Sequence, residues 1–434
     1  MSRRLAAGLV IAAAACGGSS NNHTGADAGS GGGQDAGSNT GSDPLTAVGS
    51  GLFTIPLTTP TGDDAGAIYN VAFTASGTTF SVTIDTGSTT AAIAGSNCSG
   101  CSGVSPLYAL GAGARQTGGS DSESYEDGTG WGGSIVDDGV TFGGGLPAEP
   151  LKFVDITSSQ DFFDGNEYQG IVGMATDGLL DPGETAYYTT LVQAGMTPVQ
   201  AYELCPTGGT LWFGGFDATH TTGALQTAAL LGGSADNSVY YAVDMTAMAL
   251  GSADLGATES SLDGPVVDTG TSLMYIPTPA ETAFLADLNA SASFKALFPK
   301  QTIDETDNGQ CVNAATGTTD TMVDDMLPPL KLTITGTSGP FTLSLPALSY
   351  LYNGGGGQYC LGMFDGGDDG DATLGDVFMT AFVTVIDTGH ETIGFAPTAT
   401  CKAPEVVQAV QPHRIRELGR GPHRHHPRVP GSAR

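Results

Sequence analysis

The amino-acid sequence predicts a mainly β protein with few short helices, arranged as two similar halves. Glycine accounts for 66 of the 434 residues, and with frequent threonine and serine it favours short strands joined by tight turns. One phrase, an apolar run that ends in Asp-Thr-Gly and hydroxyl residues, occurs once in each half of the chain. An internal repeat with so long a period predicts two similar lobes.

Short alternating or apolar runs mark the expected strands along the chain. They are residues 52–57, 68–75, 80–85, 133–143, 210–216, 239–245, 330–335, 341–345 and 382–387. Helical patterns occur at 185–196 and, more strongly, at 278–290. In the second, Thr278 is expected to cap the helix and Pro279 to occupy its first turn.

The repeated phrase reads FSVTIDTGSTT at residues 80–90 and GPVVDTGTSLM at 264–274. Each copy is followed, later in its own half, by two residues and a glycine: Ile-Val-Gly at 171–173 and Thr-Leu-Gly at 373–375. A single Asp-Thr-Gly would be weak evidence in a chain of this composition, but the matching contexts make the first two copies informative.

The formal net charge is −31. Between Gly49 and Cys401 the basic residues are Arg115, Lys152, Lys295, Lys300 and Lys331. Because such a body has no cationic stripe, we expect it to bind neither nucleic acid nor anionic lipid headgroups. The excess acid either serves solubility or adapts the protein to acidic surroundings, where protonation relieves the self-repulsion.

The N-terminus is typical of an export signal, with positive charge in MSRR and a short apolar segment up to Cys16. The small residues around Cys16 are similar to a bacterial lipoprotein signal, in which this cysteine carries the lipid; the alternative is an ordinary signal peptide with an incidental cysteine. Residues 1–16 are therefore the predicted signal, 17–48 a flexible Gly/Ser/Asp linker, and 402–434 a disordered basic tail without assigned function. The expected location is extracytoplasmic, either lipid-anchored in the cell envelope or secreted.

Six further cysteines suit an oxidising compartment. Cys98 and Cys101 can close a small loop, and Cys311 with Cys360 a larger one, which leaves Cys205 and Cys401 by elimination. Cys98-x-x-Cys101 could instead be redox-active or half of a zinc site. No second Cys-x-x-Cys and no nearby histidine support a metal, so neither metal nor cofactor is expected.

An ordered series of motifs between residues 50 and 401 resembles the pepsin-like aspartic peptidases. IYNVAFTASGTTFSVTIDTGST at 68–89 matches the N-terminal strands of that family, and NCSGC at 97–101 its small disulfide loop. YEDGTGWGGSIVDDGVTFGG at 125–144 resembles the flap hairpin, and YQGIVGMA at 168–175 the segment that closes the first core. The closing pattern follows in ATLGDVFMTAFVTVIDTGHETIGFAP at 372–397.

The resemblance implies a bilobal pepsin-like acid protease fold, with β-barrel-like lobes at 49–225 and 226–401 around a central cleft. It further implies a monomeric endopeptidase that acts on polypeptides and hydrolyses peptide bonds with a water activated between Asp85 and Asp268. Two carboxylates held face to face resist joint ionisation and retain one proton, which supplies both a base and an acid. This coupling in aspartic proteases is a known reference case for paired carboxylates.

The same resemblance assigns supporting roles around the two aspartates. Thr86 and Thr269 would brace the two loops against each other. Gly87 and Gly270 would let backbone N–H groups approach the carboxylates, and Ser88 and Thr271 would donate to their outer oxygens. The third triplet, which begins at Asp387, falls where the family has a turn between its last two strands, so we expect a β-turn there.

Tyr125 matches the flap tyrosine that closes over substrate, while Phe163 and Tyr168, with Phe162 and Met174, lie where the family lines its first binding pocket. Apolar or aromatic substrate side chains are therefore expected beside the cleaved bond, although these residues could equally be core.

One departure from the family pattern concerns the partner of the flap tyrosine. Ala92 stands where the family usually has a tryptophan that partners this residue, and Trp131 is a candidate replacement. The departure leaves a second hypothesis, a pepsin-fold protein that binds peptide, carbohydrate or protein without cleaving it. Residues 17–48 contain no Lys or Arg and so do not resemble a basic inhibitory prosegment. We therefore expect activity without self-cleavage.

Overall fold

The computed structural model describes residues 51–60, 68–125, 128–163, 168–180, 183–231, 239–262, 264–306, 309–367 and 372–401, together with two short strands, β1 (Ala7–Gly8) and β26 (Glu417–Leu418), that pair with each other. The predicted signal with Cys16, the linker at 17–48 and the basic tail otherwise lie outside the described residues. No helix among the described residues is both long and apolar enough to span a membrane.

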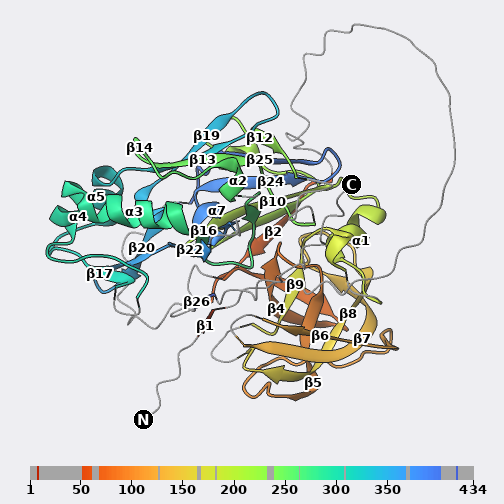
Figure 1. Cartoon of the computed structure of the whole chain (residues 1–434). Helices are drawn as coiled ribbons and strands as arrows, with labels where there is room; N and C mark the ends of the chain where they lie inside the picture. The colour runs from red at the N-terminus through yellow and green to blue at the C-terminus, as the bar shows by residue number, and fades with distance from the viewer. Residues whose placement is uncertain are drawn as a thin grey trace, which may run out of the picture.

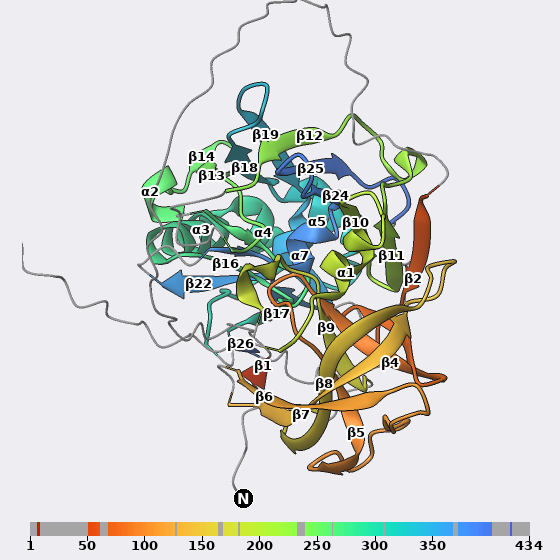
Figure 2. The same ribbon diagram turned by 90° about the vertical axis from the view of Figure 1, so that its right-hand side faces the viewer.

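Figures 1 and 2 show two bodies of mostly β-structure, as the sequence predicts. The first is a seven-stranded sheet in the order β3-β4-β9-β5-β8-β7-β6. It curls back on itself because β3 also pairs with β7, through Thr74 with Thr141 and Ala75 with Val140. Its strands are β3 (Asn70–Ala75), β4 (Thr78–Asp85), β5 (Ala91–Ser99), β6 (Arg115–Ser124), β7 (Gly130–Thr141), β8 (Glu149–Gln160) and β9 (Gly170–Gly173).

The second body contains three smaller sheets. The first joins β14 (Ala253–Asp254), β13 (Met245–Leu250), β18 (Leu330–Ile334) and β19 (Phe341–Leu345). The second joins β15 (Val266–Val267), β23 (Thr373–Leu374), β16 (Met274–Pro277) and β22 (Met363–Gly367). The third joins β17 (Cys311–Asn313), β21 (Gln358–Leu361) and β20 (Leu351–Gly355).

Short helices cover the second body. They are α2 (Glu259–Leu262), α3 (Thr278–Ala290), α4 (Ala292–Leu297), α5 (Asp320–Met326), α6 (Ala347–Tyr350) and α7 (Asp376–Met379). Helix α3 buries Ala280, Phe284 and Leu288, which recur at the four-residue spacing that places side chains on one helix face. Strand β18 buries every second residue instead, as a sheet with one covered face requires.

A six-stranded sheet links the two bodies, in the order β12-β25-β24-β10-β11-β2. It combines β2 (Phe53–Leu57), β10 (Val199–Cys205) and β11 (Gly208–Phe213) with β12 (Gln226–Ala229), β24 (Phe382–Asp387) and β25 (Thr392–Pro397). Strands from before and after residue 225 therefore share one sheet, and the lobe boundary at 225/226 remains a prediction. Helix α1 (Tyr187–Gln193) and the 3-10 turns η1 (Asp177–Leu179) and η2 (Ala218–His220) complete the described elements.

Two local predictions differ from the structure. Residues 239–245 are not a strand apart from an isolated bridge at Ala242 and the first residue of β13, so the aromatic pair Tyr240-Tyr241 indicated packing rather than pairing. Thr278 is the first helical residue of α3 and not its cap, which is Pro277. The Thr278 hydroxyl donates instead to Asp365 Oδ1 at 2.6 Å.

The three predicted disulfides are present: Cys98–Cys101, Cys205–Cys401 and Cys311–Cys360. Glu203 lies with Cys205 and Cys401 in a group whose ligand atoms are within 4.8 Å of one another. Because both sulfur atoms are bonded to each other, this group offers no thiolate to a metal.

Candidate active site

The two Asp-Thr-Gly phrases occupy equivalent places in two copies of one strand arrangement. In the first, β9 pairs in parallel with β4, opposing Asp85 to Gly173, and antiparallel with β5. In the second, β23 pairs in parallel with β15 and antiparallel with β16. Each aspartate thus leaves the end of a buried strand whose neighbour is the strand of the second repeated element. The internal duplication read from the sequence is present in the topology.

Thr86 and Thr269 join the two loops by reciprocal hydrogen bonds. The Thr86 hydroxyl donates to the Val267 carbonyl at 3.0 Å and accepts from the Thr269 N–H at 2.9 Å. The Thr269 hydroxyl donates to the Ile84 carbonyl at 3.1 Å and accepts from the Thr86 N–H at 3.1 Å. Both threonines are buried, so these bonds fix the loops of the two halves against each other.

The two carboxylates have matching hydrogen-bond partners. Asp85 Oδ1 accepts from the Gly87 N–H at 2.8 Å, and Asp85 Oδ2 accepts from the Ser88 hydroxyl at 2.5 Å. Asp268 Oδ1 and Oδ2 accept in the same way from the Gly270 N–H at 2.8 Å and the Thr271 hydroxyl at 2.6 Å. The predicted partners of both aspartates therefore occupy the expected positions.

Each glycine faces the carboxylate of the other loop. A Cβ on Gly87 would lie 2.9 Å from Asp268 Oδ2, and a Cβ on Gly270 would lie 2.2 Å from Asp85 Oδ1. Any larger residue would push the carboxylates apart, so glycine is required by the close approach of the two halves. Asp85 is fully buried and Asp268 is 5% exposed.

The environment of the pair favours a retained proton. Burial, then the negative charge of Asp268 and a side-chain hydrogen bond with Asp268, hold the pKa of Asp85 well above its usual range. Hydrogen bonds from Ser88 and Gly87 act in the opposite direction and are outweighed. A pair of buried carboxyl groups with one raised pKa can offer an acid and a base in the same place.

A third carboxyl, Asp376, lies near this pair and was not singled out from the sequence. It follows Gly375 as Met174 follows Gly173, so it breaks the symmetry of the duplication. Asp376 is 1% exposed, and neither of its oxygens has a hydrogen-bond partner among the described residues. Burial and then the charges of Asp268 and Asp85 raise its pKa well above the usual range. Aligning the two copies would have drawn attention to Asp376, because the equivalent position in the first copy is Met174.

A buried chain of hydrogen-bonded polar side chains connects to the backbone of the Asp85 loop. The Tyr202 hydroxyl donates to Gln200 Oε1 at 2.7 Å, and Gln200 Nε2 donates to the Tyr241 hydroxyl at 2.7 Å. The Tyr241 hydroxyl donates to the Met174 carbonyl at 2.8 Å, while the Met174 N–H donates to the Asp85 carbonyl at 2.6 Å. Sequence analysis missed these residues because their partners lie on segments far apart in the chain.

The predicted flap tyrosine has an aromatic partner on the neighbouring strand. Tyr125 follows β6 and is 5% exposed, and its hydroxyl accepts a hydrogen bond from Trp131 Nε1 at 2.7 Å. Its ring stacks on Phe162 at a centroid distance of 5.4 Å. Ala92 is buried in β5, so Trp131 of β7 supplies the indole donor that Ala92 cannot.

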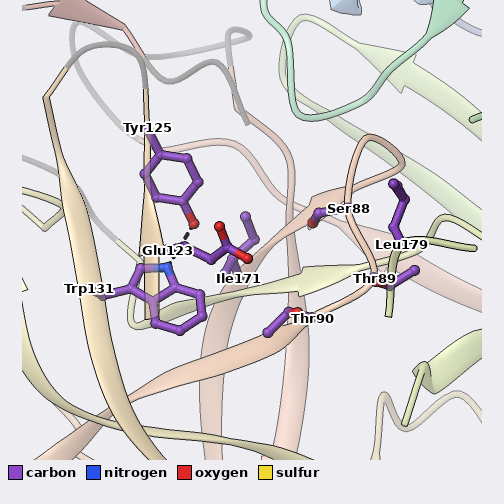
Figure 3. Close-up of a pocket in the computed structure, with 8 residues that line it drawn as sticks. All are labelled: Ser88, Thr89, Thr90, Glu123, Tyr125, Trp131, Ile171 and Leu179. Atoms are coloured by element: carbon purple, nitrogen blue, oxygen red, sulfur yellow. Dashed lines mark hydrogen bonds between the residues drawn. The ribbon is translucent and has the colours of Figure 1, made fainter. Parts of the chain in front are cut away.

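A pocket lies between this aromatic pair and the Asp85 loop (Figure 3). Its lining comprises Ser88–Thr90, Glu123, Tyr125, Trp131, Ile171 and Leu179. Phe163 and Tyr168 are buried with Tyr125 and Trp131 in one hydrophobic cluster but do not line the pocket, and neither does Met174. Glu123, which lies in β6 two residues before Tyr125, was not singled out from the sequence.

The third Asp-Thr-Gly lies away from the pair and begins a turn. Asp387 ends β24, and its Oδ1 accepts from the His390 N–H at 3.0 Å while Oδ2 pairs with His390 Nδ1 at 2.7 Å. The hairpin closes with Asp387 opposite Thr392. The turn expected for this triplet is confirmed.

Comparison with known proteins agrees with this geometry. The family model described as "Eukaryotic aspartyl protease" matches residues 69–398. The chain is 27% identical over 341 residues to an "Aspartic protease" of Phaffia rhodozyma, which covers 78% of each protein. It is 27% identical over 336 residues to a "Probable vacuolar protease A" of Trichophyton verrucosum, covering 73% of this chain and 75% of the relative. It is also 25% identical over 272 residues to "Pepsin A" of Rhinolophus ferrumequinum, covering 60% and 62%.

The family match spans the repeated strand arrangement, both aspartate loops and the β6–β7 hairpin. The chain therefore belongs to the eukaryotic aspartyl protease family, with the bilobal pepsin-like fold, and it is an aspartic-type endopeptidase.

Proposed function

We propose that Asp85 and Asp268 form the catalytic dyad of this endopeptidase and share one proton. The ionised member takes a proton from a water held between the two carboxyl groups, and the water oxygen attacks the peptide carbonyl carbon. The protonated member donates its proton to the carbonyl oxygen. The aspartate that took the proton of the water then gives it to the peptide nitrogen, the other aspartate takes a proton from a hydroxyl of the tetrahedral intermediate, and the C–N bond breaks.

The observation that carries this proposal is the mutual approach of the two loops. A Cβ added to Gly87 or Gly270 would overlap the carboxylate of the opposite loop, so the two loops approach closely. Burial and the charge of Asp268 raise the pKa of Asp85. Ser88 and Thr271 each hold an outer oxygen, which orients both carboxylates toward a common point. Positioned acid and base groups of this kind contribute about 10²–10⁴-fold each to a rate.

We assign Tyr125 to the flap that closes over the substrate. Its hydrogen bond from Trp131 and its stacking on Phe162 hold the ring in place, and this pair stands beside the pocket that adjoins Asp85. Phe163 and Tyr168 would then affect substrate binding indirectly, because they pack in the same hydrophobic cluster as Tyr125.

The proposal is tested by cleavage of denatured globin in acid, with and without pepstatin, by the wild-type protein and by Asp85→Asn and Asp268→Asn. Each substitution removes the proton relay, so each should lower kcat by about 10³-fold or more. Asp387→Asn is the matched control, because it changes the same triplet at the turn, and it should retain activity. Thermal unfolding should show that all three variants are folded, so that a loss of activity reports on the dyad. Cleavage that persists in both dyad variants would exclude this assignment.

The segments at the ends carry finer proposals. We propose that Cys16 is lipidated and tethers a monomeric, extracytoplasmic enzyme through the linker at 17–48, and that the lobes divide near residue 225. The lipoprotein-like context of Cys16 and the disulfides, which form in oxidising compartments, support this placement. Fatty-acid labelling that survives in the wild type and disappears in Cys16→Ser would support the anchor; equal labelling of both would exclude it.

A further inference from the structure

We propose that Tyr241 is a positioning residue that holds the Asp85 loop and the strand before Asp268 in one arrangement, with Gln200 fixing its hydroxyl. The inference rests on the proposed function, because it names what keeps the two carboxyl groups of the dyad at their working separation. It adds a second link between the two halves, beside the bonds of Thr86 and Thr269. Tyr241 and Gln200 are both fully buried.

The backbone of the Asp85 loop hangs on the segment at 173–175, which follows directly from β9. Three successive N–H groups of this segment donate to carbonyls of the loop. The first donates to Thr90 at 2.9 Å, the second to Asp85 at 2.6 Å and the third to Ser88 at 2.8 Å. A shift of this segment therefore moves the Asp85 carboxylate with it.

The carbonyl of Met174, at the centre of that segment, accepts two hydrogen bonds from side chains. They come from the Tyr241 hydroxyl at 2.8 Å and from Gln200 Nε2 at 3.1 Å. Because a carbonyl can only accept, it fixes which end of the Gln200 amide is the nitrogen, and Tyr202 donates to the other end at 2.7 Å. Gln200 Nε2 also donates to the Tyr241 hydroxyl at 2.7 Å, so that hydroxyl has its own proton free to donate to Met174.

The main chain of Tyr241 bonds to the other half of the site. Its carbonyl accepts from the Val267 N–H at 2.9 Å, and Val267 immediately precedes Asp268. The next residue, Ala242, forms an antiparallel bridge with the first residue of β15. Tyr241 therefore contacts the strand that leads into Asp268 through its backbone and the segment that carries Asp85 through its hydroxyl.

The second aspartate loop obtains the equivalent bond from a helix. Asp376 occupies the place of Met174 in the second copy, and its carbonyl accepts from the Thr380 N–H at the end of α7 at 2.8 Å. Met174 is followed instead by the 3-10 turn η1. Tyr241 and Gln200 thus supply from two distant segments what α7 supplies locally in the second copy.

Loss of the Tyr241 hydroxyl should act on the rate through the geometry of the dyad. It would remove one bond from the Met174 carbonyl and leave a buried N–H of Gln200 without its acceptor. The segment can relieve this cost by shifting, which displaces Asp85 relative to Asp268. A misplacement of about 1 Å at a reacting group can cost about 10²-fold in rate, so a smaller shift should cost about tenfold.

The first test compares Tyr241→Phe with Tyr350→Phe in peptide cleavage. Tyr350 is also fully buried, and its hydroxyl donates to the Pro328 carbonyl at 2.7 Å, outside both aspartate loops. Both variants lose one buried hydrogen bond and should lose similar stability in thermal unfolding. Tyr241→Phe alone should lower kcat and kcat/KM together by about tenfold, with KM kept within about twofold. Equal kcat in the two variants would overturn the proposal.

Hydrogen exchange followed by mass spectrometry supplies a readout that does not depend on cleavage. In Tyr241→Phe, peptides that span residues 84–92 and 170–177 should exchange about tenfold faster, whereas Tyr350→Phe should leave them unchanged. Unchanged exchange of these peptides in Tyr241→Phe would overturn the positioning role and leave the proposed dyad standing. Cleavage by Asp85→Asn would overturn the proposed function and leave the exchange result as it is.

A double-mutant cycle tests the part of Gln200. Gln200→Met preserves the length of the side chain but removes both N–H donors, so it should lower kcat as well. Because both side chains act on the Met174 carbonyl, the double variant with Tyr241→Phe should lose little more than the larger single loss. Losses that multiply would overturn the role of Gln200. Since Gln200 bonds the same carbonyl, Gln200→Met also carries the exchange test if Tyr241→Phe does not fold.

Discussion

Trp131 is the residue whose contact with Tyr125, the proposed flap residue, most clearly distinguishes this chain from the expected family pattern. Its Nε1 donates to the Tyr125 hydroxyl from the neighbouring strand of the same hairpin, rather than from the position of Ala92. Tyr125 is thereby held by a residue that follows it within the same hairpin. Tyr125 and its hydrogen-bond donor therefore belong to one hairpin, whereas a donor at position 92 would belong to β5.

Trp131→Phe should lower kcat/KM by about five- to tenfold, because it removes one buried hydrogen bond while preserving an aromatic ring. Peptide cleavage by the purified variant measures the loss. The control is Trp212→Phe, at the other tryptophan of the chain, which is buried in β11 of the six-stranded sheet and outside the pocket. A Trp131→Phe variant as active as Trp212→Phe would show that the Tyr125 hydrogen bond does not serve catalysis.

Sequence analysis succeeded with residues whose role is encoded locally. The hydrogen bonds from Ser88 to Asp85 and from Thr271 to Asp268 each join side chains three residues apart, so a short motif is enough to predict them. Asp376 is the opposite case, since its importance depends on burial near a pair contributed by two other segments. A short sequence motif does not predict which distant segments of the chain will pack together in the fold.

At the scale of elements, the two aspartate loops are held by the hydroxyls of Thr86 and Thr269. Each hydroxyl bridges a carbonyl and an N–H of the opposite loop, so the contact is symmetric and contains no water-exposed partner. The strands behind the loops repeat the same order in both halves. The bonds between the loops therefore set the distance between the carboxylates.

Thr86→Val should cost about 2–4 kcal/mol of stability, because the Val267 carbonyl and the Thr269 N–H lose a buried partner. Activity should fall as well, since the loops lose their register. Thr86→Ser keeps the hydroxyl and should recover most of both properties. Thermal unfolding and peptide cleavage measure the two effects, and equal behaviour of the Val and Ser variants would contradict this role.

The strands were predictable where burial alternates within a single run, as in β18. The run at 239–245 was predicted as a strand, but its backbone pairing is limited to an isolated bridge at Ala242, and Tyr241 is fully buried and hydrogen-bonded to Gln200 and Met174. A short apolar run looks the same in the sequence whether it forms a strand or packs as an irregular buried segment. The six-stranded sheet could not be predicted in detail, since its strands come from both ends of the chain.

At the scale of the whole molecule, buried carboxyl groups with raised pKa values predict that the protein is most stable in acid. Burial, followed by the charges of Glu305 and Asp365, raises the pKa of Glu281 from 4.5 to about 7, and burial raises that of Asp155 from 3.8 to about 6. Between the unfolded and folded pKa values the native state binds more protons than the unfolded state. Stability is therefore fully present in acid and falls as pH rises through this interval.

The unfolding midpoint should accordingly drop by at least about 5 °C between pH 4.5 and pH 7, the interval set by Glu281. Glu281→Gln cannot ionise and should show a smaller drop. Glu259→Gln removes one exposed charge and should behave as the wild type, which separates local burial from the general repulsion of a net charge of −31. Scanning calorimetry across this range decides the question; a midpoint that rises with pH would refute the account.

The bilobal fold serves to bring one aspartate from each half to a common point. A crystal structure of the protein with pepstatin measures this most directly. We predict that the central hydroxyl of pepstatin lies within hydrogen-bond distance of carboxyl oxygens from both Asp85 and Asp268, beneath Tyr125. Pepstatin bound elsewhere, or a hydroxyl in contact with one aspartate while the other turns away, would contradict it.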